Sequence, residues 1–170
     1  MNTGQSLLSI GALFLLSLTV LRVNNSILTT DSVMMDSKFG ILATSIATSL
    51  IEKASKKAFD ANTFENSVST KSALTSANAL GPGSGESAPD SCNDFDDFDG
   101  YTDQITNLPS AIFDVSCEVC YVDPDDPDGK LSTQSWHKKM TVTVTSPNIG
   151  NEERTDTIRL STIYSYWHFR

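Results

Sequence analysis

The first third of the chain changes from uniformly apolar to apolar on one side. Residues 7–21 (LLSIGALFLLSLTVL) carry no charge, and their polar side chains are two serines and one threonine. From Phe39 onward, apolar residues recur mostly every three or four positions, which is the period of an amphipathic helix. Lysines gather at residues 53–57, where the helix dipole favours cations. We therefore predict one helix over residues 5–59, with residues 5–23 as its membrane part.

The apolar run is short for a membrane span, and three interpretations compete. At 1.5 Å per residue it covers roughly 22 Å of a hydrocarbon core about 30 Å thick, and Arg22 could reach the interface. The run could be a cleaved signal peptide, a plain anchor, or a membrane-inserted helix that continues outward. The leader Met-Asn-Thr-Gly-Gln has no basic residue, and no small-x-small site follows the run, which disfavours signal cleavage. The uninterrupted pattern up to residue 59 favours the continuing helix.

The remainder reads as a linker followed by a β-rich head. Residues 60–90 include a stretch rich in Ser, Ala, Gly and Thr, which is typical of a flexible linker. In the head, residues 91–170, three segments have strand character: 112–122, 138–145 and 155–167. The Asp128-Gly129 turn and residues 146–151 would join them into an antiparallel meander of three or four strands.

The predicted helix and sheet need each other, because each has an apolar face to bury. We therefore predict an α+β fold in which the long N-terminal helix, first transmembrane and then amphipathic, packs on a small antiparallel sheet. The expected contacts are those of Ile46, Leu50, Ile51 and Ala54 with Val142, Val144, Ile158 and Leu160.

Two acidic runs raise the question of calcium. In residues 94–101 (DFDDFDGY) we expect the aromatic side chains Phe95, Phe98 and Tyr101 to pack inward and the aspartates to stay solvated. An EF-hand would need an oxygen ligand at the fifth position of its loop, which is Phe98 in this run and Pro127 in residues 123–129. Calcium binding of another kind remains open at both runs.

The three cysteines, Cys92, Cys117 and Cys120, allow at most one internal disulfide. Residues three apart on a strand point to opposite faces, so Cys117 and Cys120 should not bond to each other, although one of them could pair with Cys92. Zinc would need a second ligand pair, and His137 and His168 stand at unsuitable spacing. We predict no metal or redox site here.

The charge balance excludes some partners. The formal net charge is −9, and from Asp60 onward there are 18 acidic and 7 basic residues. A head this acidic repels nucleic acid, so we expect no nucleic-acid partner. The sequence contains no Gly-x-Ser-x-Gly, phosphate-binding glycine loop or His-Glu-x-x-His motif. We therefore expect neither an enzyme nor a cofactor.

This architecture resembles the type IV pilin and type II secretion pseudopilin superfamily. Gly4-Gln5-Ser6-Leu7-Leu8 is similar to a prepilin cleavage site, with residues 1–4 as the leader and Gln5 as the mature N-terminus. Residues 96–101 and the Thr/Val-rich strand before the last turn resemble minor MSHA-type pilin-like proteins. The resemblance implies a single-pass membrane protein with an extracytoplasmic head. It also implies other pilin-like subunits as partners, bound through an assembly helix that includes Leu7, Leu8, Ile10, Leu13 and Phe14.

The chain departs from the family in two features. Pilins usually carry Glu five residues after the cleavage point, where this chain has Ser9, and the basic leader is also missing. In the family that carboxylate pairs with the N-terminal amine of a neighbouring subunit. The departure favours a minor or tip subunit, of a pilus or of a secretion system. The alternative is a membrane-anchored envelope protein whose β-rich head binds a partner without polymerising.

Overall fold

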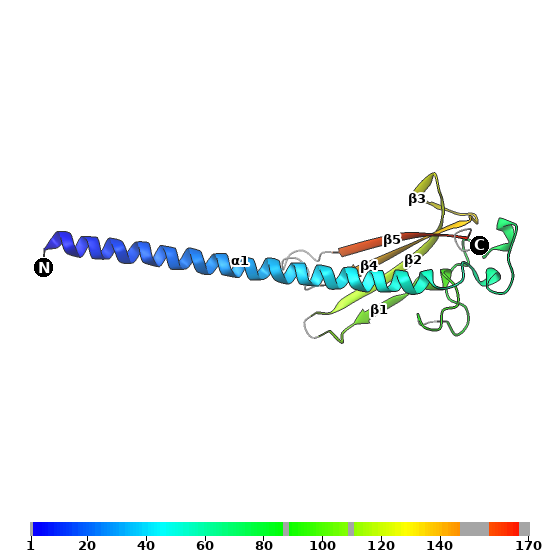
Figure 1. Cartoon of the computed structure of the whole chain (residues 1–170), viewed down its shortest axis with the longest axis horizontal. Helices are drawn as coiled ribbons and strands as arrows, with labels where there is room; N and C mark the ends of the chain where they lie inside the picture. Colours follow the sequence, from blue (N-terminus) through cyan, green and yellow to red (C-terminus); the bar gives the residue numbers. More distant parts are fainter. Residues whose placement is uncertain (1, 87–88, 109–110, 147–156, 167–170) are drawn as a thin grey trace. The chain divides into compact units, whose positions relative to one another are not determined.

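The computed structural model describes residues 2–86, 89–108, 111–146 and 157–166 (Figure 1). It is an α+β protein, as predicted, with one long N-terminal helix followed by an antiparallel sheet of five strands. The elements are α1 (Thr3–Ser55), β1 (Thr102–Ile105), β2 (Phe113–Asp123), β3 (Asp126–Leu131), β4 (His137–Thr145) and β5 (Thr157–Ser165).

The chain divides into two compact units within α1, Met1–Lys38 and Phe39–Arg170. In the first unit, no described residue is buried. Its large apolar side chains are all exposed, from Leu8 at 77% to Leu18 at 42%. The apolar run of residues 7–21 is therefore open on every side of the helix.

The second part of α1 has one buried stripe. Its members are spaced three or four residues apart, as a single helix face requires, and are Phe39, Ala43, Ala47, Leu50 and Ala54. They share a core with alternate residues of β2 and β4, including Val115, Val142 and Val144. The expected packing of Ile46, Leu50, Ile51 and Ala54 with Val142, Val144, Ile158 and Leu160 is confirmed.

The helix ends at Ser55, four residues before the predicted end. The amides of Lys56 and Lys57 already bond three residues back, which tightens the last turn. Ala58 then forms a short parallel bridge with Asp94: its amide donates to Asn93 O at 3.3 Å and its carbonyl accepts from the Phe95 amide at 2.8 Å. The backbone of Ala58 is needed for this pairing, so the helix stops before it.

The sheet has the order β1-β2-β4-β5, with β3 paired to the end of β2. Its residues alternate between the core and the other face, and Cys117, Val142 and Leu160 lie in one cross-strand row on the core side. The expected meander is present with two additional short strands, β1 and β3.

The turn after β2 differs from the predicted one. Pro124 and Asp125 form it, and the Asp125 amide donates to the Asp123 carboxylate at 3.0 Å. Asp128-Gly129, predicted as the turn, lies within β3. Pairing with β2, in which Val122 lies opposite Lys130, keeps Asp128 and Gly129 within the strand. The predicted connection at residues 146–151 lies outside the described residues, apart from Ser146.

The segment after α1 contains local structure. Short 3-10 helices cover Ala61–Thr63 and Lys71–Ala73. Leu74 is buried with Phe59 and Tyr121 in a second, small apolar cluster.

The three cysteines are in the thiol form, with Cys117 on the buried face of β2 and Cys120 half-buried on the opposite one. Burial raises the pKa of Cys117 to about 12 and also raises the pKa values of Cys92 and Cys120. His137 Nδ1 lies 2.7 Å from Ser165 Oγ. His168 lies outside the described residues.

Candidate functional site

The residues predicted to serve processing and assembly lie together at the start of α1. Gly4 and Gln5 are in its first turn. The predicted assembly residues Leu7, Leu8, Ile10, Leu13 and Phe14 are 64–77% exposed. The structure thus places every one of them on open helix surface.

This part of α1 is suited to a membrane. Its most apolar window of 18 residues has a mean hydropathy of 2.0, with none of that window buried in the protein. Two hydroxyls of this stretch bond to the helix backbone: Ser9 donates to Gln5 O at 3.0 Å and Thr19 to Leu15 O at 2.8 Å. These bonds reduce the polar surface that would face hydrocarbon, and α1 is long and apolar enough to act as a single-pass membrane anchor.

A second site, a charged cluster, is buried in the head. It is made by three segments distant in sequence: the chain after α1, which supplies Asp60; the 3-10 helix Asp96–Phe98 with the preceding Asp94; and the start of β4, which supplies Lys138. The bridge between Ala58 and Asp94 brings the first two segments side by side. Lys138 comes from the core face of β4, two residues before Met140.

The Lys138 ammonium is the centre of this cluster. Its side chain is fully buried, and Nζ lies 2.8 Å from Asp60 Oδ2, 2.5 Å from Asp96 Oδ1 and 2.8 Å from Phe59 O. The ring of Phe59 lies beneath it, with the centroid 4.5 Å from Nζ. Two carboxylates, a carbonyl and an aromatic face thus replace the water that a lysine normally holds.

Asp60 is held as an anion. Its Oδ1 accepts from the Asn62 amide at 3.1 Å and the Thr75 hydroxyl at 3.0 Å. Its Oδ2 accepts from the Thr75 amide at 3.0 Å, and the Tyr121 hydroxyl lies 3.3 Å away. Burial alone would raise the pKa of Asp60, but Lys138 and these donors together lower it below its ordinary value.

The other carboxyls of the cluster behave differently. Burial, and then the neighbouring Asp96 carboxylate, raise the pKa of Asp94 to about 8, so that Asp94 is largely protonated at neutral pH. Burial also raises the pKa of Asp96, although Lys138 and a hydrogen bond with Asp94 act in the opposite direction. Asp97 caps the backbone, accepting from the Asn93 amide at 2.8 Å and the Asp94 amide at 3.1 Å.

Sequence reasoning missed this cluster. The aromatic residues Phe95 and Phe98 pack inward as expected, but the prediction that the aspartates stay solvated is wrong, because Asp94, Asp96 and Asp97 are at most 4% exposed. The backbone amides of the turn and the Lys138 ammonium replace their water. The period of two along β4 was the available signal, since it places Lys138 on the same face as Met140.

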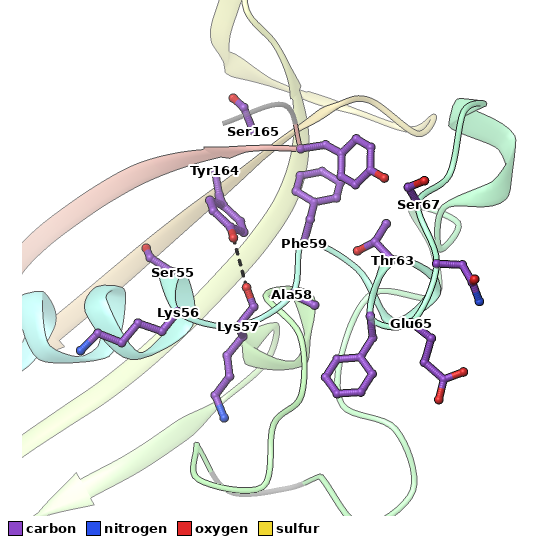
Figure 2. A pocket seen from close by; sticks show the side chains of 13 residues that line it. Ser55, Lys56, Lys57, Ala58, Phe59, Thr63, Glu65, Ser67, Tyr164 and Ser165 are labelled. Atoms are coloured by element: carbon purple, nitrogen blue, oxygen red, sulfur yellow. Dashed lines mark hydrogen bonds between the residues drawn. The ribbon is translucent and has the colours of Figure 1, made fainter. Parts of the chain in front are cut away.

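The head also has an open cavity of about 700 Å³ at the end of α1 (Figure 2). Phe59 and Tyr164 stand on one side of it, with ring centroids 5.9 Å apart, and Thr63 and Glu65 on the other. The Tyr164 hydroxyl donates to Lys57 O at 3.1 Å, which ties β5 to the end of the helix. No paired nucleophile and base lines this cavity among the described residues.

Among the residues the structure describes, no group of three or more His, Cys, Asp or Glu side chains is placed to hold a metal ion. A comparison with protein-family models, curated proteins and solved structures finds no match. The fold and the exposed helix therefore define the class: an α+β protein in which the described residues include one candidate membrane helix, whose last turns pack in the core of a β-sheet head.

Proposed function

We propose that this chain is a minor pilin-like or pseudopilin-like structural subunit, assembled through its N-terminal helix with other pilin-like subunits, and not an enzyme. The observation that carries the proposal is that one uninterrupted helix serves two purposes. Its residues 7–21 are apolar and exposed, and its last turns pack in the core of the head. A plain anchor needs no such continuity, because a flexible linker would hold the head at a membrane equally well.

Small residues supply the means of close helix contact. Gly11 lies in the exposed apolar stretch, and a Cβ added there would meet nothing within 4 Å. Apolar helices in a membrane associate through small residues that let their backbones approach. Gly11 is thus free to receive a neighbouring helix.

The test replaces Gly11 with Leu. Within the chain the change has room and raises helix propensity, and it keeps the segment apolar. We expect the variant to insert in the membrane but to be lost from filaments sheared from cells that also express the partner pilins. Leu16→Met, at an exposed position of the same stretch, is the matched control and should be retained. Equal behaviour of the two variants would support the plain anchor instead.

Ser9 sets the place of the subunit in such an assembly. Ser9 has no carboxylate to pair with the N-terminal amine of another subunit, and its hydroxyl already donates to Gln5 O within the helix. An unpaired charge in hydrocarbon costs several kcal/mol. We therefore propose that this chain forms no long homopolymer and requires at least one pilin partner that carries the Glu. Electron microscopy of long filaments made from this chain alone would refute that requirement.

A further inference from the structure

The buried cluster around Lys138 has the composition and geometry of a condensation site, a conclusion independent of the proposed function. An amine and a carboxylate are held in contact at 2.5 Å between Nζ and Asp96 Oδ1, with side-chain exposures of 0% and 3%. The centroids of the Phe59 and Tyr121 rings lie 4.5 Å and 5.2 Å from Lys138 Nζ, and the side chains of Lys138, Asp60 and Asp96 are at most 3% exposed, so bulk water is excluded. When two reacting groups are already held in contact, the reaction does not need to overcome the entropic cost of bringing them together, which is a large part of the barrier to amide formation.

The two carboxylates that contact Lys138 are not equivalent. Asp60 is bound by backbone amides and by the Thr75 hydroxyl, which favour its anion and make it a poor electrophile. Asp96 instead faces the Asp94 carboxyl, which holds a proton at neutral pH. A proton donor beside a carboxylate is what converts it into an acceptor for an amine.

We propose that Lys138 and Asp96 condense without any other reactant to form an intramolecular isopeptide bond between Nζ and Cγ. Lys138 gives one proton to the Asp96 carboxylate that it contacts. The neutral amine attacks Cγ, the C–N bond forms, and a C–O bond breaks. The departing hydroxyl takes the proton of Asp94 and leaves as water, and the nitrogen gives its second proton to Asp94. Asp94 therefore returns to its starting protonation, Asp60 stays an anion, and nothing is oxidised or reduced.

The surroundings favour this product. A buried ion pair keeps two desolvated charges, whereas the amide is neutral and needs only one donor and one acceptor to be satisfied. The bond would join β4 to the 3-10 helix 42 residues earlier. It would therefore tie the acidic turn covalently to the sheet.

A second lysine–aspartate pair in the same chain provides a control. Lys139 Nζ lies 2.7 Å from Asp128 Oδ1, but the Asp128 side chain is 92% exposed. The nitrogen–oxygen distance in this pair is similar to that between Lys138 and Asp96, but Asp128 is not buried and has no protonated carboxyl beside it. We expect no condensation there.

The test is mass spectrometry of the full-length chain, purified in detergent, reduced and alkylated. We expect a mass lower by one water molecule than the mass calculated for the chain from its observed N-terminus. Trypsin should then release residues 131–139, uncut after Lys138, joined to residues 72–130, which contain Asp96. An unmodified intact mass would overturn the proposal. A link to residues 58–71 would overturn the choice of Asp96, because that peptide contains Asp60.

Variants separate the roles. Lys139→Arg should leave the linked peptide unchanged, whereas Asp96→Ala should abolish it. Asp94→Asn keeps an oxygen for the turn amides but has no acidic proton, so the bond should form more slowly by a factor of about 100 or more. Formation at the wild-type rate in this variant would overturn the role of Asp94.

Discussion

Replacing Leu50 with Ala tests whether the second part of α1 is the core of the head. Leu50 is 9% exposed and belongs to the stripe that packs against the sheet. Its backbone is helical on both sides, so the change removes side-chain contacts without altering the local structure. Ala is also the best helix former, so helix propensity does not explain any loss.

The expected cost follows from the surroundings of the side chain. Buried Leu→Ala changes cost about 2–5 kcal/mol, with the larger values where the cavity stays empty. Leu50 also lines an open cavity of about 370 Å³ with Ile46 and Val115, so water and neighbouring side chains can fill part of the space. We therefore expect a loss of about 2–4 kcal/mol in the free energy of unfolding.

The assay is urea or thermal unfolding of the full-length chain in detergent, followed by circular dichroism in the strand region. For a chain of this size the loss corresponds to a fall in Tm of roughly 4–16 °C. Ile41→Ala is the matched control in the same helix, because Ile41 is 70% exposed, and it should change stability by less than about 0.5 kcal/mol. Equal effects of the two changes would refute the packing of α1 under the sheet.

Three further outcomes are expected. Mass spectrometry of the native protein should find its N-terminus at Gln5, and recovery of intact Met1 would contradict processing. Burial raises the pKa of Asp99 above its ordinary 3.8, so its stabilising contribution is complete at low pH and is lost as pH rises through the raised pKa. Asp99→Asn should therefore weaken the decline of the unfolding midpoint above pH 3.8, and an unchanged pH profile would refute this. In the folded chain, iodoacetamide should modify Cys120 well before Cys117, and equal rates would contradict the burial of the latter.

Much of the fold could be predicted from periodicity. The steps of three and four after Phe39 identify the buried face of α1, and the alternation in residues 140–145 identifies that of β4. These patterns can be read from the local sequence, because burial of one face of a helix or strand makes apolar residues recur at the period of that element. The turn after β2 was misplaced because Pro124-Asp125 and Asp128-Gly129 are both dipeptides that favour turns. Pairing of β3 with β2 places the second dipeptide inside a strand.

The buried cluster could not be predicted in the same way. Lys138 contacts Asp60, 78 residues earlier, and Asp96, 42 residues earlier. No local sequence pattern predicts contacts between residues so far apart in the chain, and charged residues are normally exposed. The aspartates are buried only because three segments converge and supply each other's hydrogen bonds, which is a property of the tertiary structure.

Assembly through the N-terminal helix is tested most directly by photo-crosslinking in the native membrane. A photoreactive amino acid at Phe14, which is 64% exposed, would report what covers the bare part of α1. The account predicts a cross-link to the apolar N-terminal helix of a second pilin-like protein that carries Glu at its fifth mature position, and loss of that cross-link with Gly11→Leu. Cross-links to lipid alone, unaffected by Gly11→Leu, would contradict it.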